Sequence, residues 1–596
     1  MAKIFEDLAD RIIETDYLII GGGLVGSMSA IRAKQNNPKM DVTIIDKAKI
    51  EWGGDGVGLD NFNGIPLRKE DLTRDYTTAD AAKAVFGAKR LQGLSDVTLG
   101  AEQGKYPYIA LPILEEVGVR VKEDDGTLYV LQAYRTGVNW GRIEYEEDGK
   151  PCEPLFGSFS RGTDLKARLG AAVRNKYGCR VFDRTMVTSV ITRDGVAIGA
   201  TAINVRNNEF ILIKAKAILM STGMASRLYP YTNSPYPNNL FYTITSPVNH
   251  GGGHIAALHA GAKLLSMEMG NFYNVSKGIN HSSGGGGCNW YYRMYNSKGE
   301  ALEDKYADRM VTKIGGMIPG LGYLFAPDMQ NAEVLNDVIL SYKDKADSDL
   351  IAAVYFTAAT EPMKALKFHK LAGGLTNELP VECTYISTGV GMAGINGIKR
   401  VNIHSETGVK NLFAAGGSVG GGTGFTWSCL IADYVTEEIK GKDHAKFDGD
   451  QLKQVEDTKQ WVFAPLGRKA EFAVNPMELE SYVKGVNHNY VGLQKYTSKM
   501  QRGLELVKRA KDGSVPLLTA DNPHELMRAI EVQQIIEISE MHIQSSLIRD
   551  ESRLVPVHYR VEYPEKDDDR WYNKVVTVAH EAGENKFAVE ILNKDL

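Results

Sequence analysis

Several features that define whole classes of protein are missing from this 596-residue sequence or scarce in it. Five cysteines are too few for a disulfide framework, which favours a reducing compartment. No apolar run approaches the roughly 20 residues of a membrane-spanning helix, and the polar, acidic start differs from a secretory leader. A net charge of −5 without a basic run disfavours nucleic acid as the main partner. We therefore expect a cytoplasmic globular protein.

Local catalytic signatures are also absent. The sequence contains no HExxH zinc motif, no GxSxG nucleophile elbow, no Walker loop and no cysteine-rich iron–sulfur motif. The 61 glycines, in contrast, gather in clusters, which indicates that the backbone approaches a ligand at several places. Because the chain is too long for one hydrophobic core, we expect two or three domains.

The first glycine cluster lies between a predicted strand, Asp16–Ile20, and a predicted helix, Ser27–Lys34. Gly21, Gly23 and Gly26 give the GxGxxG pattern, which lets the backbone turn tightly and approach a pyrophosphate at the helix N-terminus.

A second strand, Asp41–Ile45, leads to Asp46, an acid at the distance from the glycines that a ribose hydroxyl requires. Together the strand, turn, helix, strand and acid predict a dinucleotide site.

Two later segments decide which dinucleotide is bound. Lys214–Ala225 reads as a strand followed by Ser-Thr-Gly, and Asn411–Gly424 as a strand followed by a second glycine loop. Both resemble the FAD-binding pattern of the succinate dehydrogenase and fumarate reductase flavoprotein family, and the adenylylsulfate reductase alpha branch looks most similar. His250–Leu264 resembles a helix of that family, although Gly417 replaces the usual acid of the late loop.

The resemblance implies a bound FAD and assigns residues to it. The segment after the second strand, Glu51–Gly58, has no histidine for covalent attachment, so we expect non-covalent FAD. The implied cofactor-binding residues are Gly21, Gly23, Gly26, Asp46, Lys47, Asn63, Val187, Thr222, Gly223, Gly416, Gly417 and Cys429.

The resemblance also implies an α/β fold: a Rossmann-like FAD-binding domain with an inserted α+β capping domain and a helical C-terminal domain. The expected bounds are 1–260 and 374–445 for the FAD-binding domain, 261–373 for the capping domain and 446–596 for the C-terminal domain. Helical periodicity over 497–549 agrees with this division.

The charged anchors of the family's dicarboxylate site are replaced. Its two substrate histidines correspond to Tyr273 and Thr384, and its two arginines to Cys288 and Gly424. A dianion needs charge-assisted partners, so their loss favours a small neutral or apolar substrate. Arg293 and Arg135 are the cations left for a rival hypothesis, an adenylylsulfate-reductase-like enzyme acting on a sulfur compound.

Three of the five cysteines, Cys288, Cys383 and Cys429, correspond to segments near the reacting side of the flavin in the family. Buried cysteine often serves as a small apolar side chain. The alternative is a thiolate site for a transition metal such as nickel, with His250 or His281 as an additional ligand. Under that hypothesis the catalytic residues are Tyr273 and the three cysteines.

The sequence therefore predicts an FAD-dependent oxidoreductase that reduces the C=C bond of a small neutral or apolar substrate, as anaerobic isoprene reductases do. Because no nicotinamide site remains, electrons should come from a separate ferredoxin-like iron–sulfur subunit. Beside the sulfur-compound hypothesis, the alternatives are a fumarate-reductase-like enoate reductase and an electron-transfer flavoprotein without a substrate of its own.

Overall fold

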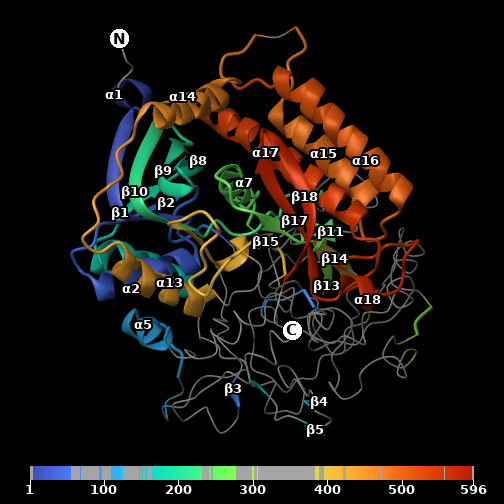
Figure 1. Ribbon diagram of the computed structural model, residues 1–596, viewed down its shortest axis with the longest axis horizontal. Helices are drawn as coiled ribbons and strands as arrows, with labels where there is room; N and C mark the ends of the chain where they lie inside the picture. Colours follow the sequence, from blue (N-terminus) through green and yellow to red (C-terminus); the bar gives the residue numbers. More distant parts are fainter. Residues whose placement is uncertain are drawn as a thin grey trace.

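The computed structural model of the chain describes long stretches of its N-terminal and C-terminal parts. The described residues are 5–54, 67–68, 93–94, 96, 109–122, 124, 126, 146–147, 150–151, 155–156, 164–230, 241–242, 246–270, 272–276, 298–300, 305, 383–387, 395–419, 424–469, 471–555 and 557–592. Within these ranges no helix is long and apolar enough to cross a membrane. Figure 1 shows a central sheet flanked by helices, with the C-terminal helices along one side.

A seven-stranded sheet forms the centre of the N-terminal part, in the order β7–β2–β1–β10–β9–β8 with β16 paired to the end of β10. The parallel strands are β1 (Arg11–Ile20), β2 (Val42–Asp46), β7 (Arg180–Asp183), β10 (Phe210–Met220) and β16 (Leu412–Ala414), and the antiparallel strands are β8 (Thr185–Arg193) and β9 (Val196–Asn204). Both predicted strands of the dinucleotide motif are confirmed. The first begins earlier, at Arg11, because Arg11–Thr15 also pair with β10.

Hydrophobic layers cover both faces of this sheet, because successive side chains of β1 point to opposite sides. Tyr17 and Ile19 join one layer with α2 and α13, whereas Leu18 and Ile20 join the other with α7 and α17. These helices are α2 (Leu24–Asn36), α13 (Gly424–Glu438), α7 (Gly252–His259) and α17 (Pro523–Ile548). Figure 1 shows α2 and α13 side by side below the sheet. The predicted helix over Ser27–Lys34 is confirmed as the middle of α2.

The C-terminal part is built mainly of helices, as predicted. They are α14 (Gly449–Phe463), α15 (Pro476–Val491), α16 (Thr497–Arg509), α17 and α18 (Asp568–Trp571). The start of α17 follows from its sequence, because the Asn522 side chain accepts the amide N–H of Glu525 and Pro523 occupies the first helical position. Three helices, α15, α16 and α17, pack on one another.

A β-hairpin near the C-terminus was not predicted. Strands β17 (Lys574–Glu581) and β18 (Glu584–Ile591) form the hairpin. It joins β12 (Leu264–Leu265) and β15 (Gly397–Ile398) in a four-stranded sheet with the order β15–β12–β17–β18. The C-terminal part is therefore not purely helical, and its hairpin is joined to segments that follow α7 and precede β16.

A small three-stranded sheet has the order β11–β14–β13 and contains β11 (Phe241–Tyr242), β14 (Cys383–Ser387) and β13 (Phe272–Ser276). The shorter described elements are α1 (Phe5–Leu8), β3 (Leu67–Arg68), α5 (Leu111–Glu116), β4 (Glu146–Glu147), β5 (Lys150–Pro151), β6 (Leu155–Phe156) and α6 (Leu165–Ala171). Most of the expected capping domain, 261–373, lies outside the described residues, so the domain bounds stay predictions.

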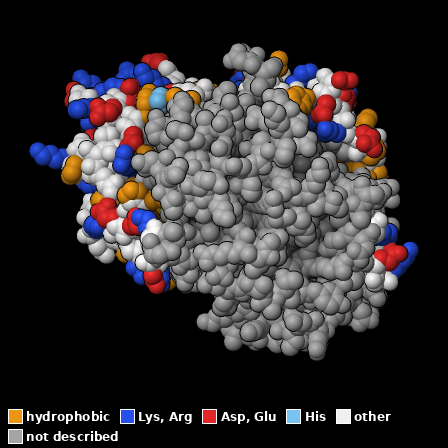
Figure 2. Space-filling model, turned by 90° about the horizontal axis from the view of Figure 1, so that it is seen from below, with side chains coloured by type: hydrophobic (Ala, Val, Ile, Leu, Met, Phe, Trp, Pro, Cys, Tyr) orange, Lys and Arg blue, Asp and Glu red, His pale blue; other side chains and the backbone are white. Residues whose placement is uncertain are grey.

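Charges of both signs are mixed on the described surface. In Figure 2, Lys and Arg side chains lie among Asp and Glu side chains on both flanks of the molecule. This mixture agrees with the small net charge of the whole sequence.

Candidate cofactor site

Three loops that are far apart in sequence meet at the carboxyl ends of three neighbouring parallel strands. They follow β1, β10 and β16, which are paired in the order β1–β10–β16. Ligands of open α/β sheets bind at this edge, where the loops emerge. We call the three loops, residues 21–26, 221–225 and 415–418, the cradle.

The glycines of the first loop are required by space and by backbone conformation. Gly21 has φ +101°, and a Cβ there would collide with the carbonyl oxygen of Ser221. A Cβ at Gly26 would collide with the carbonyl oxygen of Gly21. Above Gly23, in contrast, no described atom lies within 4 Å, and α2 begins there without a side-chain cap. An uncapped helix N-terminus under open space suits a pyrophosphate.

Asp46 and Lys166 fix the first loop from two sides. Asp46 is buried and accepts the amide N–H of Gly22 and that of Ala48, both at 2.7 Å. Lys166, at the start of α6, donates to the carbonyl oxygens of Gly22, at 2.7 Å, and Ile50. Burial lowers the pKa of Lys166 to about 8, although the charge of Asp46 opposes the shift. Lys166 was not predicted, because only the fold brings α6 beneath the turn.

The second and third loops close on the first. Ser221 donates its hydroxyl to the carbonyl oxygen of Gly21 at 2.7 Å, and the hydroxyls of Thr222 and Ser418 lie 3.3 Å apart. Gly416 has φ +69°, and a Cβ there would lie 2.9 Å from Val25. The structure thus brings together the predicted positions on all three loops.

Two details explain local departures from the family pattern. A Cβ at Gly417 would lie 2.9 Å from the Met224 side chain, so the methionine occupies the space beside the missing acid. Gly253 lies so close to Thr222 that a Cβ would collide with the threonine hydroxyl. The Gly-Gly-Gly start of α7 therefore lets this helix pack directly on the cradle.

Val187 lies in β8, at the edge of the sheet. The amide N–H of Arg184 donates to the carbonyl oxygen of Ala48 at 3.0 Å, which places the start of β8 beside the end of β2. The pairing of β8 with β9 is irregular between Val187 and Ser189. This edge therefore adjoins the strand end that carries Asp46.

Lys47 is predicted to bind the cofactor, and in the structure its side chain enters a buried ionic cluster. Its ammonium donates to Glu531 Oε1 at 2.6 Å and to His250 Nδ1 at 2.7 Å. Arg227 donates to Glu531 at 2.6 Å and pairs with Glu480. We call these five residues the Glu531 cluster. It links the residue after Asp46 to helices α15 and α17.

The charges in this cluster, together with burial, shift the pKa values of its members and so set their protonation states. Burial raises the pKa of Glu531, but the charges of Lys47 and Arg227 outweigh it and hold that pKa well below its usual range. Burial and the charge of Lys47 lower the pKa of His250 to about 4. Nδ1 of His250 accepts from Lys47, and Nε2 donates to Gln534 at 2.7 Å. Both ring nitrogens of His250 therefore have protein partners in this structure, and its role as an additional metal ligand stays a prediction.

The cysteines occupy different environments. Cys429 is fully buried in the apolar layer between α2 and α13, and burial raises the pKa of its thiol to about 12. This position favours the packing role for Cys429. Tyr273 and Cys383 lie on the paired strands β13 and β14, where Tyr273 is opposite Ile386 and Ser276 is opposite Cys383. The remaining predicted residues, Cys288, His281 and Asn63, lie outside the described residues.

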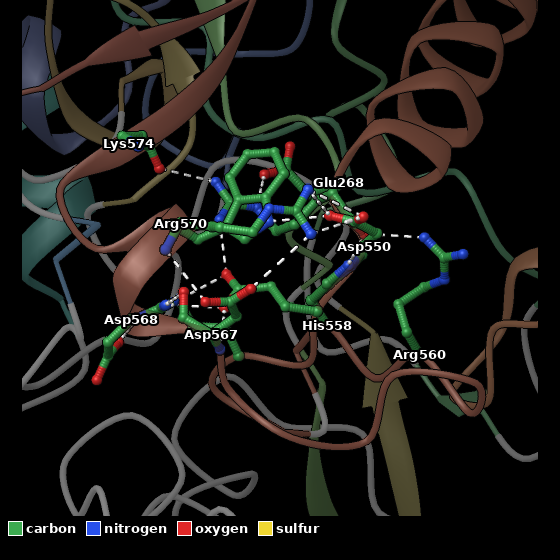
Figure 3. Close-up of polar contacts among 12 residues, drawn as sticks. Glu268, Asp550, His558, Arg560, Asp567, Asp568, Arg570 and Lys574 are labelled. Carbon is green, nitrogen blue, oxygen red and sulfur yellow. Dashed lines mark hydrogen bonds and ion pairs between the residues drawn. The ribbon is translucent and has the colours of Figure 1, made fainter.

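A second buried ionic cluster lies next to the chain that leads into β13. Arg549 donates to Glu268 Oε1 at 2.6 Å and to Glu551 at 2.8 Å, and Glu551 also binds Arg553. Lys495 donates to the backbone carbonyl of Glu268 at 2.9 Å, and burial lowers the pKa of this lysine to about 7. We call these residues the Glu268 cluster. Figure 3 shows Glu268 of this cluster together with the nearby pair of Arg570 and Asp550.

Comparisons with known proteins agree with this architecture. The family model "FAD binding domain" matches residues 152–313, and "Fumarate reductase flavoprotein C-term" matches 482–595. An uncharacterized FAD-dependent oxidoreductase of Methanocaldococcus jannaschii is 22% identical over 95% of this chain and 96% of its own. One of the subunits of the fumarate reductase (CoM/CoB) of Methanothermobacter marburgensis is 24% identical over 94% and 96%.

Solved structures show the same fold. An adenosine-5-phosphosulfate reductase in complex with sulfite aligns with a TM-score of 0.73 and 20% identity, covering 99% of this chain and 98% of its own. The quinol fumarate reductase of E. coli aligns with a TM-score of 0.74 and 17% identity, covering 98% of both chains. The predicted FAD-binding α/β fold is thereby confirmed. Similarity to fumarate reductase flavoproteins thus extends over almost the whole chain, and the chain is an FAD-dependent oxidoreductase of that type.

Proposed function

We propose that this chain is the flavoprotein component of a reductase that saturates the C=C bond of a small neutral or apolar alkene such as isoprene. The observation that carries the proposal is the replacement of the family's charged substrate anchors by Tyr273, Cys288, Thr384 and Gly424. The pairing of β13 with β14 supports the assignment, because it places Val275, two residues after Tyr273, opposite Thr384. A substrate without carboxylates needs no arginine or histidine clamp.

FAD would lie in the cradle. The open N-terminus of α2 above Gly23 would hold the pyrophosphate, and Asp46 would meet the ribose. Thr222, Gly223, Gly416 and Gly417 would line the flavin side, with Val187 near the adenine and Asn63 as a further contact. When bound, FAD supplies hydride transfer to the substrate. The segment 51–58 contains no histidine, which supports non-covalent attachment.

Electrons would arrive from a separate iron–sulfur protein in the cytoplasm. The glycine turn is occupied by FAD in this proposal, and the sequence has neither a second dinucleotide motif nor a cluster-binding cysteine motif. The name of the relative from Methanothermobacter marburgensis describes that protein as one of several subunits, which supports a partner chain.

A transition metal such as nickel would be held by thiolates near the flavin. Cys288 and Cys383 are the ligands we propose. The apolar burial of Cys429 makes it the weakest of the three predicted ligands. A redox-active metal at this place would activate a double bond that carries no electron-withdrawing group.

Reoxidation of the reduced flavin tests the function. The anaerobically purified protein is reduced with dithionite, and the flavin absorbance is followed after addition of isoprene, fumarate, crotonate or adenylylsulfate. We expect reoxidation by the neutral alkene only. Reoxidation by fumarate or adenylylsulfate without any by alkenes would overturn the proposal in favour of a rival hypothesis, and a reduced flavin that no compound reoxidises would favour an electron-transfer protein.

Elemental analysis and two glycine variants test the sites. We expect about one transition metal per FAD, lost in Cys288→Ser and retained in Cys429→Ser. Gly23→Val should lose FAD without unfolding, because its side chain enters open space over the cradle. The matched control is Gly449→Ala, which also stands in open space at a helix N-terminus. Full FAD content in Gly23→Val would contradict the placement of the pyrophosphate.

A further inference from the structure

Outside the cradle, one group of side chains has the composition and spacing of a metal site. His259, Glu537 and His580 each offer a ligand atom, and these atoms lie within 4.8 Å of one another. His259 ends α7, Glu537 lies in the middle of α17, and His580 lies near the end of β17. The three side chains thus come from three elements that pack on one another.

The contacts within this group resemble those around bound zinc. His259 Nε2 lies 2.9 Å from Glu537 Oε1, and the two imidazole rings have centroids 4.4 Å apart. Zinc bonds of about 2.0–2.2 Å to histidine and carboxylate place neighbouring ligand atoms about 3.3 Å apart, so small side-chain rotations would bring all three to one ion.

A fourth residue orients the ligands. Asn585 Oδ1 lies 2.8 Å from His580 Nδ1, and Asn585 Nδ2 donates to Glu537 at 3.4 Å. With Nδ1–H donating to Asn585, the free lone pair of His580 is on Nε2. Metal-binding histidines are usually fixed in this way by a carbonyl oxygen on the far ring nitrogen.

The access also suits a cation. The His259 side chain is 44% exposed, whereas that of Glu537 is 15% exposed. An ion can therefore enter from solvent on the His259 side and meet a fixed, half-buried carboxylate.

We propose that His259, Glu537 and His580 bind a divalent transition metal ion of the zinc type, with water in the fourth position, and that the ion joins α7 to α17 and β17. The site is independent of the proposed cysteine site. It would link the helix that packs on the cradle to the C-terminal part of the chain. Binding to the folded state alone would stabilise the protein in proportion to the zinc concentration.

Zinc titration of the FAD-loaded full chain tests this site. The protein is stripped with EDTA, desalted and titrated with Zn²⁺ against a chromophoric chelator, in a Cys288→Ser background that removes the cysteine contribution. We expect one Zn²⁺ per chain and a rise in Tm of about 2–5 °C on saturation. His259→Ala and Glu537→Gln should each weaken binding at least about tenfold. His524→Ala, an exposed histidine on the same helix, should bind zinc normally.

Three outcomes would overturn the proposal. The first is the absence of saturable binding up to about 100 µM Zn²⁺. The second is unchanged affinity in both His259→Ala and Glu537→Gln. The third is a melting temperature that does not respond to zinc, which would contradict the role of the ion as a link. None of these results depends on alkene reduction, so the two proposals fail separately.

Discussion

Two fully buried glutamates, Glu531 and Glu268, differ in their cationic partners and in the direction of their pKa shifts. Glu531 binds the ammonium of Lys47 and the guanidinium of Arg227, each at 2.6 Å. Glu268 binds Arg549 through one oxygen, and its other oxygen has no hydrogen-bond partner within the described part of the chain. Burial raises the pKa of both, but only around Glu531 do the cations outweigh it, so the pKa of Glu268 stays raised.

This difference indicates which of the two clusters stabilises the fold through charged groups. Removing a carboxylate from water costs several kcal/mol, which one guanidinium does not fully offset. Two direct cationic partners keep Glu531 ionised, so the Glu531 cluster is a charged link between the end of β2 and the C-terminal helices. The raised pKa of Glu268 disfavours its ionised form, so the charge of its cluster comes mainly from the buried pairs of Glu551 with Arg549 and Arg553.

The strongest test of this comparison is Arg227→Met. This change removes the buried guanidinium that bridges Glu480 and Glu531, and breaking a buried pair costs about 3–5 kcal/mol of unfolding free energy. Urea-induced unfolding measures the loss.

The matched control for that variant is Arg528→Met. Arg528 also reaches Glu480 at 3.1 Å and Glu531 at 3.5 Å, but its side chain is 22% exposed. We expect this change to lower the free energy of unfolding by about 1 kcal/mol, because Arg528 forms partly solvated ion pairs. Equal losses of unfolding free energy in the two variants would show that the burial of Arg227 does not increase its contribution to stability.

The two glutamates can also be compared directly through isosteric changes. Glu531→Gln should lower the free energy of unfolding by about 3 kcal/mol, because it leaves Lys47 as a buried cation with a neutral partner and Arg227 with Glu480 as its ionic partner. Glu268→Gln should cost less than about 1 kcal/mol, because its raised pKa shows that ionisation is already disfavoured. Both are measured by urea unfolding at pH 7. A larger loss in Glu268→Gln would reverse the assignment of the charged cluster.

The sequence was sufficient to predict the cradle because its signals are local. Glycine is required at positions 21 and 26 by the backbone conformation and by close contacts. Asp46 is recognised because it directly follows the predicted strand Asp41–Ile45. The meeting of the three loops could also be predicted, since each follows a strand of one parallel sheet. The side-chain direction of Lys47 could not, because it depends on Glu531, which lies 484 residues further along the chain.

Other features gave weaker signals. Glu531 stands among apolar residues of a predicted helix, so a buried acid with a cationic partner could have been suspected, but not which partner. The hairpin of β17 and β18 turns at Ala582 and Gly583, both with positive φ, as in a type I′ turn. That turn is most readily predicted from Asn-Gly, and Ala-Gly is a much poorer signal. Strand pairing with β12 and β15 depends on distant segments.

The last prediction concerns pH and separates the buried histidines from both glutamates. Burial, together with nearby positive charge, lowers the pKa of His250 to about 4 and of His542 to about 3. In the unfolded chain both titrate near about 6.5. Below that pH the unfolded state binds protons that the folded state does not. Stability is therefore full above about pH 6.5 and falls toward pH 4, by about 1.4 kcal/mol per pH unit for each histidine.

Urea unfolding between pH 7 and pH 5 measures this loss, which should reach about 2 kcal/mol per histidine. Glu531 contributes little in this window, because a carboxylate with a lowered pKa loses its stabilising effect only below the unfolded value of about 4.3. His250→Gln should reduce the slope by one proton, whereas the exposed His524→Gln should leave it unchanged. If His250→Gln kept the wild-type slope, the acid sensitivity would come from the other buried histidines, among them His254 and His542, and the low pKa assigned to His250 in the Glu531 cluster would be wrong.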